Sequence, residues 1–267
     1  MHNGNREMKP QYTWTTTVVW LLGLCLLVTG CASSLYGWQV RTTSTPIPPS
    51  FNLAALEQHS IALFGAVTSA PLQGNEVALS SLLEQIFEKV RPNWKVMSPQ
   101  ELVKRINRKG LAEEYARMRV DYERTNILEG GSLRKIANGI GVRYVFQPRL
   151  IALSQTLIDR WSFLDVRLVQ TRSSIMRVSL QLWDAETGEM VWASMAETTM
   201  QNEAVSQDPV YLEDISRVTL ASMGADFVKR KTASRYSPVN KILNDMLEEA
   251  MPPQNPDNQE LLEPGKH

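Results

Sequence analysis

The sequence predicts a mixed α/β domain, in which helices pack on a β-sheet, and three observations support this prediction. Short apolar runs of the length of a buried strand alternate with segments whose apolar residues recur at helical spacing. A β-hairpin pattern follows in the second half of the chain. No repeat is visible at the periods typical of solenoids or propellers. We therefore expect one α/β domain with C-terminal helices, spanning residues 59–251.

Two strand–helix units open the predicted domain. Ser60–Val67 is an apolar run typical of a buried central strand, and Asn75 is expected to cap the amphipathic helix that follows. Trp94–Met97 predicts a second strand. Directly after it, Ser98 precedes a proline and stands three residues before Glu101, which is the pattern of a capping box with proline at the first helical position. A helix is therefore predicted to begin here.

Further helices and a long strand are expected in the middle of the chain. Apolar residues recur at helical spacing over Leu111–Tyr122, and Ser132 is expected to cap a short helix that ends near Gly141. Val142–Leu153 then predicts a long strand. Pro148 interrupts this strand, and because proline has no N–H to donate, we expect it at a bulge or along an edge.

The second half predicts a hairpin and then helices. Arg177–Trp183 and Glu189–Ser194 alternate around a turn that contains a glycine, which is typical of a β-hairpin. Asp208 and Pro209 indicate the start of a helix, and another helix is expected after Ser237. The tail, residues 252–267, is polar, acidic and rich in proline, and we expect it to be disordered.

The first 30 residues have the three parts of a signal peptide. Arg6 and Lys9 give a positive start, and an apolar core extends from Val18 to Val28. The core ends in the pattern of a bacterial lipoprotein cleavage box, formed by Leu27, Val28, Thr29, Gly30 and Cys31. This pattern predicts cleavage before Cys31 and attachment of lipid to its thiol. Roughly eleven apolar residues are too few for a transmembrane helix, which needs about 20, but an uncleaved inner-membrane signal anchor is the alternative.

The residues after the cleavage box suggest where the protein is held. Ala32 follows the cysteine where an aspartate would resemble an inner-membrane retention signal, so we expect the periplasmic face of the outer membrane. Thr42–Ser50 has no hydrophobic periodicity. Residues 31–58 are therefore predicted to form a lipidated N-terminus and a flexible tether.

Composition excludes some classes of function. Cys25 lies in the leader and Cys31 is predicted to carry lipid, so no cysteine remains for a disulfide. The chain has 28 basic and 28 acidic residues. Without a basic face to neutralise phosphates, we expect no nucleic-acid partner.

One segment is a candidate for partner binding. Trp161, Phe163 and Leu164 belong to an unusual insertion between two predicted strands. Large apolar and aromatic side chains often anchor protein interfaces. The alternative interpretation is that these residues complete the local core or extend a hairpin.

Two segments carry a family resemblance: "IANGIGVRYVFQPRL" and "VSLQLWDAETGEMVWAS", within the order strand, helix, strand, helix. Over roughly residues 60–228 the chain resembles the bacterial envelope lipoproteins related to the curli-secretion protein CsgG, with an α/β domain similar to the TolB amino-terminal domain. The resemblance implies a domain that binds or assembles rather than catalyses. Channel formation would require two membrane-spanning hairpins, whereas Lys109–Gly131 is charged and has helical spacing.

The inventory of side chains favours no catalytic site. Predicted cleavage leaves His59 and His267 as the only histidines, and hydrolytic triads and zinc sites need histidine or paired thiolates. We expect no catalytic residue, no metal and no cofactor. A non-catalytic scaffold or adaptor in envelope assembly or export is the leading hypothesis. The alternatives are a ring-forming accessory subunit of a secretion or polysaccharide-export system and a carbohydrate-active enzyme with two distant carboxylates.

Overall fold

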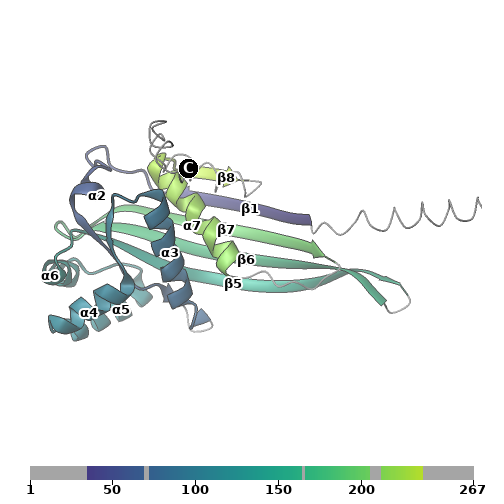
Figure 1. Ribbon diagram of the computed structural model, residues 1–267, viewed down its shortest axis with the longest axis horizontal. Helices are drawn as coiled ribbons and strands as arrows, with labels where there is room; N and C mark the ends of the chain where they lie inside the picture. The colour runs from purple at the N-terminus through teal and green to yellow at the C-terminus, as the bar shows by residue number, and fades with distance from the viewer. Residues whose placement is uncertain (1–34, 69–71, 164–165, 205–211, 237–267) are drawn as a thin grey trace, which may run out of the picture.

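The computed structural model describes residues 35–68, 72–163, 166–204 and 212–236, and it confirms the predicted mixed α/β class (Figure 1). Its centre is an eight-stranded sheet in the order β4-β2-β5-β6-β7-β1-β8, with β3 paired to β5. The strands are β1 (Leu35–Ser44), β2 (Ser60–Leu63), β3 (Val67–Thr68), β4 (Lys95–Met97), β5 (Tyr144–Phe163), β6 (Val166–Asp184), β7 (Glu189–Ala204) and β8 (Ala233–Tyr236). The helices are α2 (Ala55–Gln58), α3 (Glu76–Val90), α4 (Pro99–Arg108), α5 (Ala112–Thr125), α6 (Gly130–Ile140) and α7 (Leu212–Val228).

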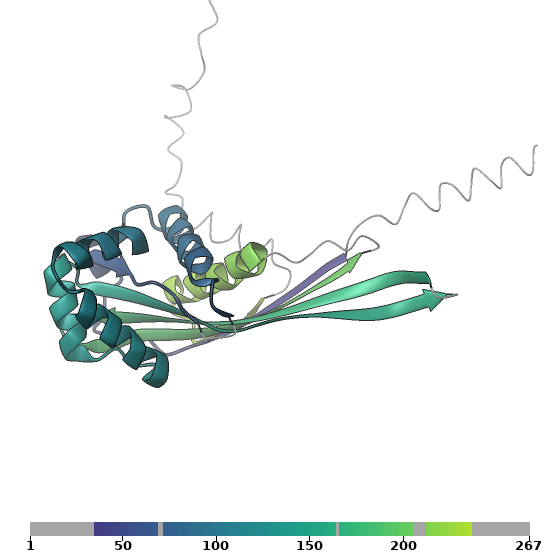
Figure 2. The ribbon, with the colours of Figure 1, turned by 90° about the horizontal axis from the view of Figure 1, so that it is seen from below.

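Helices cover both faces of the sheet, as Figure 2 shows. On one face α3 and α7 pack over the sheet, and the rings of Trp192 and Phe227 lie 4.7 Å apart in that core. On the other face α4, α5 and α6 gather at one end and bury Phe64 and Tyr122. The long strands β5 and β6 continue past the helices at the opposite end (Figures 1 and 2). Among the described residues, helices therefore cover one end of the sheet and not the other.

The expected tether contains a strand, so that prediction is wrong for Leu35–Ser44. This segment is β1, which pairs with β7 along its whole length and with β8 over Val40–Thr43. Val40 is buried in an apolar cluster, and Thr42 is buried where it donates a hydrogen bond to the Asp226 carboxylate. The domain therefore includes residues from Leu35 onward and does not begin at residue 59.

Helix starts follow the predictions in one case and differ in two. The Ser98 hydroxyl accepts a hydrogen bond from the Glu101 N–H at 3.2 Å, which confirms the predicted start of α4. Asn75 occupies the N-cap position of α3 as expected, but its side chain makes no capping bond, because its amide donates to the Leu72 carbonyl at 2.8 Å instead.

The cap of α6 is also different from the prediction. Glu129, rather than Ser132, occupies the N-cap, and its carboxylate accepts from the N–H groups of Gly131 and Ser132 at 2.7 Å each. A carboxylate at this position satisfies two free N–H groups and also complements the positive end of the helix dipole. The predicted helix end is correct, because Gly141 has a φ of 76°, the left-handed conformation that favours glycine.

The predicted strands around Pro148 and in the hairpin are confirmed, and they are longer than expected. β5 has 20 residues and β6 has 19. Along β5, pairing with β2 ends at Phe146 and pairing with β3 begins at Arg149. Pro148 falls in this gap, where no neighbouring strand needs a hydrogen bond from its backbone nitrogen. It therefore lies at a local edge, as predicted.

Several expectations fall outside the described residues. These are the leader with its cleavage box, Cys31, the helix start at Asp208 and Pro209, the helix after Ser237 and the tail. Of the helices in the described ranges, none has both the length and the apolar composition needed to cross a membrane.

Candidate functional site

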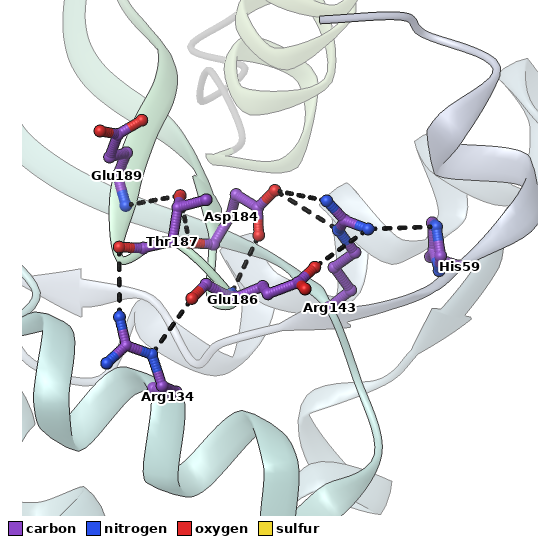
Figure 3. Close-up of polar contacts among 7 residues, drawn as sticks. All are labelled: His59, Arg134, Arg143, Asp184, Glu186, Thr187 and Glu189. Atoms are coloured by element: carbon purple, nitrogen blue, oxygen red, sulfur yellow. Dashed lines mark hydrogen bonds and ion pairs between the residues drawn. The ribbon is translucent and has the colours of Figure 1, made fainter.

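A polar cluster surrounds the turn between β6 and β7 (Figure 3). Arg143, at the start of β5, lies 3.2 Å from the Asp184 carboxylate and 3.0 Å from the Glu186 carboxylate. The other oxygen of Asp184 accepts the Glu186 N–H at 2.9 Å. The Arg143 guanidinium also lies 3.5 Å from the His59 ring nitrogen. Both oxygens of Asp184 are therefore engaged, one by the cation and one by the turn.

The same turn is held from below by α6. Arg134 donates from Nε to the Glu186 carbonyl at 3.1 Å and from Nη2 to the Thr187 carbonyl at 3.3 Å. Gly188 has a φ of 78° and closes the turn by donating its N–H to the Asp184 carbonyl at 2.8 Å. The acidic turn residues, whose pattern predicts only a hairpin, thus also tie the hairpin to α6 and to the start of β5. We interpret the cluster as structural.

A groove of about 540 Å³ lies where the chain leaves β2 and β4. Gly65 and Ala66, directly after β2, are part of its lining, and the exposed side chains of Val77 on α3 and Val103 on α4 lie along it. The parallel strands β2 and β4 are neighbours, but α3 packs on one face of the sheet and α4 on the other. A crevice forms at the carboxyl ends of parallel strands where the connections separate in this way.

Arg119 gives the groove its shape. Its guanidinium donates to the Gly65 carbonyl at 2.8 Å and to the Ala66 carbonyl at 3.0 Å, so α5 is fixed to the segment after β2. A Cβ at Gly65 would lie 2.7 Å from Arg119 Nη1, so only glycine leaves room for this contact. The guanidinium therefore binds backbone carbonyls at the wall of the groove.

Two carboxylates of α3 line the groove, and their environments differ. Glu76 accepts from the Thr68 hydroxyl and from the Gly74 N–H, and the bond from Thr68 lowers its pKa. Burial raises the pKa of Glu84, and the neighbouring Glu88 charge adds to the increase. An acid and base pair needs both groups free to face a substrate, whereas one oxygen of Glu76 is bound to Thr68 of β3 and the other to the loop before α3. The groove is therefore better suited to contact than to proton transfer.

Sequence reasoning missed this groove. Gly65 after an apolar run and the capping box at Ser98 mark two strand-to-helix transitions, and these are the only local signals. Which face each helix takes depends on long-range packing.

The predicted partner-binding residues are not brought together with the groove. Trp161 and Phe163 lie at the end of β5, where Trp161 is opposite Val169 and Phe163 is opposite Val166. Leu164 is outside the described residues. The segment is thus the end of a two-stranded ribbon formed by β5 and β6, and the backbone agrees with the alternative that these residues extend a hairpin. Within the described ranges, no group of three or more His, Cys, Asp or Glu side chains is placed to hold a metal ion.

No family model matches the sequence, and no curated protein matches it. Several solved structures are similar. A PelC dodecamer from Paraburkholderia phytofirmans has a TM-score of 0.38 at 10% identity, covering 72% of this chain and 98% of that chain. The lipoprotein GNA1162 from Neisseria meningitidis has a TM-score of 0.38 at 12% identity, covering 64% and 96%. The LpoB C-terminal domain from Escherichia coli has a TM-score of 0.33 at 14% identity, covering 52% and 81%. No functional conclusion follows from likenesses this distant, and the relation to the CsgG family stays a prediction.

Proposed function

We propose that this protein is a lipid-anchored, non-catalytic adaptor or scaffold of the cell envelope, held at the periplasmic face of the outer membrane through Cys31. The observation that carries the proposal is the position of the cleavage box, Leu27–Cys31, just ahead of β1. Only residues 32–34 separate the predicted lipid from a strand of the sheet. The lipid would therefore hold the domain directly at the bilayer, without a long flexible spacer.

The strength of such an anchor follows from its acyl chains. Each buried CH₂ contributes about 0.8 kcal/mol, and a single acyl chain binds only marginally. A lipoprotein cysteine that carries a diacylglyceryl group and an amide-linked third chain would bury far more methylenes. The domain would then stay on one membrane, which is what a scaffold in envelope assembly or export requires.

A role without catalysis is supported by how the acidic side chains are used. Asp184 holds the turn between β6 and β7, and Glu76 holds the loop before α3. By contrast, the groove between α3 and α4 exposes the apolar side chains of Val77 and Val103. Apolar surface of this kind suits contact with a partner.

The experiment is an analysis of the N-terminus, with the two cysteines as a matched pair. Mass spectrometry of the membrane-extracted protein should find residue 31 at the N-terminus with a mass increase of three acyl chains. Cys31→Ser should abolish cleavage and lipid attachment, whereas Cys25→Ser should leave both intact. An unmodified Met1 or an unmodified Cys31 in the native protein would contradict the proposal, and the first would favour the uncleaved signal anchor.

A second candidate, a ring-forming accessory subunit, is favoured by two unpaired strand edges. In the described part of the chain, no strand pairs with the outer edge of β5 over Thr156–Phe163 or with the outer edge of β1 over Leu35–Gln39. Because β5, β6, β7 and β1 alternate in direction, β1 of a second copy would continue the antiparallel order beside β5. Repeated head-to-tail pairing closes into rings when the rotation allows.

Light scattering on the full lipidated chain in detergent separates the two candidates. A single discrete mass of several subunits supports the ring. A monomer that captures a specific envelope protein by crosslinking supports the adaptor.

A further inference from the structure

The register of the sheet shows how far each strand extends at the end that the described helices do not cover. Leu35 in β1 lies opposite Glu203 in β7, Glu203 lies opposite Thr171 in β6, and Thr171 lies opposite Ile158 in β5. These four residues therefore stand at one level across the sheet. The chain enters β1 at this level, at the end that is remote from α4, α5 and α6 (Figure 1).

The β5–β6 ribbon extends beyond this level, and the length of chain between Leu35 and the predicted lipid can be compared with it. β5 continues for five residues, from Ile158 to Phe163, which is roughly 17 Å at 3.3 Å per residue. Cys31 precedes Leu35 by four positions, which allows at most about 14 Å of extended chain. The end of the β5–β6 ribbon and the predicted lipid can therefore reach the same plane.

The residues at the ribbon end are of the kinds that suit a position near the predicted lipid. The register places apolar residues opposite one another, Trp161 with Val169 and Phe163 with Val166. Figure 2 shows that the helices stop well short of this end. A two-stranded ribbon has no third layer in which to bury apolar side chains and is marginal by itself in water. Such a ribbon is stabilised when its apolar side chains are buried against a second apolar surface or a lipid bilayer.

We propose that the end of the β5–β6 ribbon contacts the same bilayer that anchors Cys31, with Trp161 and Phe163 at the level of the lipid headgroups. Tryptophan is enriched at this level because its ring is apolar and its N–H is polar. Arg160 and Arg167, on the two strands beside these residues, are suited to lipid phosphates. The lipid and the ribbon form two attachment points, so they fix the orientation of the domain as well as its location. This inference rests on the proposed lipid anchor.

The test uses the full lipidated chain and a single fluorescent label. Because the mature chain has no free cysteine, Ser162→Cys gives one reactive thiol at the ribbon end, and Lys109→Cys gives a matched thiol at the exposed end of α4. Both proteins are labelled with an environment-sensitive dye and reconstituted in vesicles of phosphatidylethanolamine and phosphatidylglycerol. Flotation of the vesicles measures anchoring, and quenching by brominated lipids measures contact of the label with the bilayer.

We expect both proteins to float, but only the label at position 162 to shift its emission to the blue and to be quenched by brominated lipid. Trp161→Ala with Phe163→Ala should abolish the quenching while flotation persists. A matched change of an exposed apolar residue on the helical end, Ile127→Ala, should leave the quenching unchanged.

Each contrary result has a separate meaning. Failure to float would overturn the lipid anchor itself. Flotation with a water-like label at position 162 would overturn the membrane contact and leave the anchor standing. A label that shifts only after an envelope protein extract is added would show that the ribbon binds a protein partner, which also overturns the membrane contact.

Discussion

Asp226 offers the sharpest test of the fold, because its carboxylate joins β1 to α7 and β8, which lie at the other end of the described chain. Asp226 is completely buried on α7. One of its oxygens accepts from the Thr42 hydroxyl of β1, and the other accepts from the hydroxyls of Ser234, at 2.8 Å, and Tyr236 around β8. Among the described residues, hydroxyl groups donate the hydrogen bonds that this buried carboxylate accepts. It is therefore expected to hold β1 and β8 against α7.

The change Thr42→Val removes one of these bonds at nearly constant volume. A hydrogen bond to a charged group contributes about 1.5–3 kcal/mol to stability. Valine leaves the carboxylate oxygen that faced Thr42 without that donor in a buried position, where water cannot easily replace the hydroxyl. We therefore expect the free energy of unfolding to fall by about 2 kcal/mol. Val40, which is buried beside Thr42 in the same strand, shows that an apolar side chain is sterically tolerated in this layer.

Urea unfolding followed by circular dichroism measures the change. Thr43→Val is the matched control, because Thr43 is the exposed neighbour in the same strand, and exposed substitutions usually change stability by less than about 0.5 kcal/mol. Thr42→Val and Asp226→Asn together should cost less than the sum of the two single changes, since both disturb one contact. Equal, near-zero effects of Thr42→Val and Thr43→Val would refute the reasoning that the Thr42–Asp226 contact stabilises the fold.

Three further predictions concern other local contacts. Ser98→Ala removes the N-cap of α4 and should lower the free energy of unfolding by about 1 kcal/mol, measured by urea unfolding. Glu114 accepts hydrogen bonds from Lys135 and Ser132, which lower its pKa to about 2. Because the pKa is lower in the folded state, the contribution of Glu114 to folding stability is present above the ordinary carboxylate pKa and is lost as the pH falls toward 2. Glu114→Gln should therefore flatten the loss of stability between pH 4.5 and pH 2 in acid titrations monitored by circular dichroism; an unchanged titration would show that the contact is not formed. Gly188→Ala forces a φ of 78° on alanine and places its Cβ 3.3 Å from the Gly130 Cα. It should lower the stability measured by thermal unfolding by about 1–2 kcal/mol. Gly139→Ala is the comparison, because the Cβ added there meets only the flexible end of the Leu111 side chain.

Apolar periodicity predicted the helices well, because the helices bury apolar faces. The stripes that predicted α3, α4 and α5 become buried residues such as Leu83, Leu102 and Met118. The Ser98 cap is a local contact between residues three apart, so its sequence signal was sufficient. Glu129 was missed because a glutamate is not among the preferred N-cap residues, and the two glycines that follow it conceal the helix start.

β1 was missed for a different physical reason. Its buried side chains include hydroxyls that have polar partners: Thr42 donates to Asp226 on α7, and Ser44 donates to Ser194 on β7 at 2.8 Å. A strand that buries hydroxyls in this way has the composition of a linker. Only the fold brings the partners of these hydroxyls, more than 100 residues away, into contact. The groove was missed because it too is formed by distant elements.

The corrected position of β1 changes how the proposed adaptor would work. A tether of residues 31–58 would let the domain sample a wide range of distances from the bilayer. With β1 in the sheet, the strands instead set the distance. From Ile158, level with Leu35, to Phe146, which lies opposite the end of β2 near the groove, β5 spans twelve residues, or roughly 40 Å at 3.3 Å per residue. A partner that binds in the groove would therefore have to present its contact surface at roughly this height. Two attachment points, the lipid and the ribbon end, would keep that height and orientation fixed.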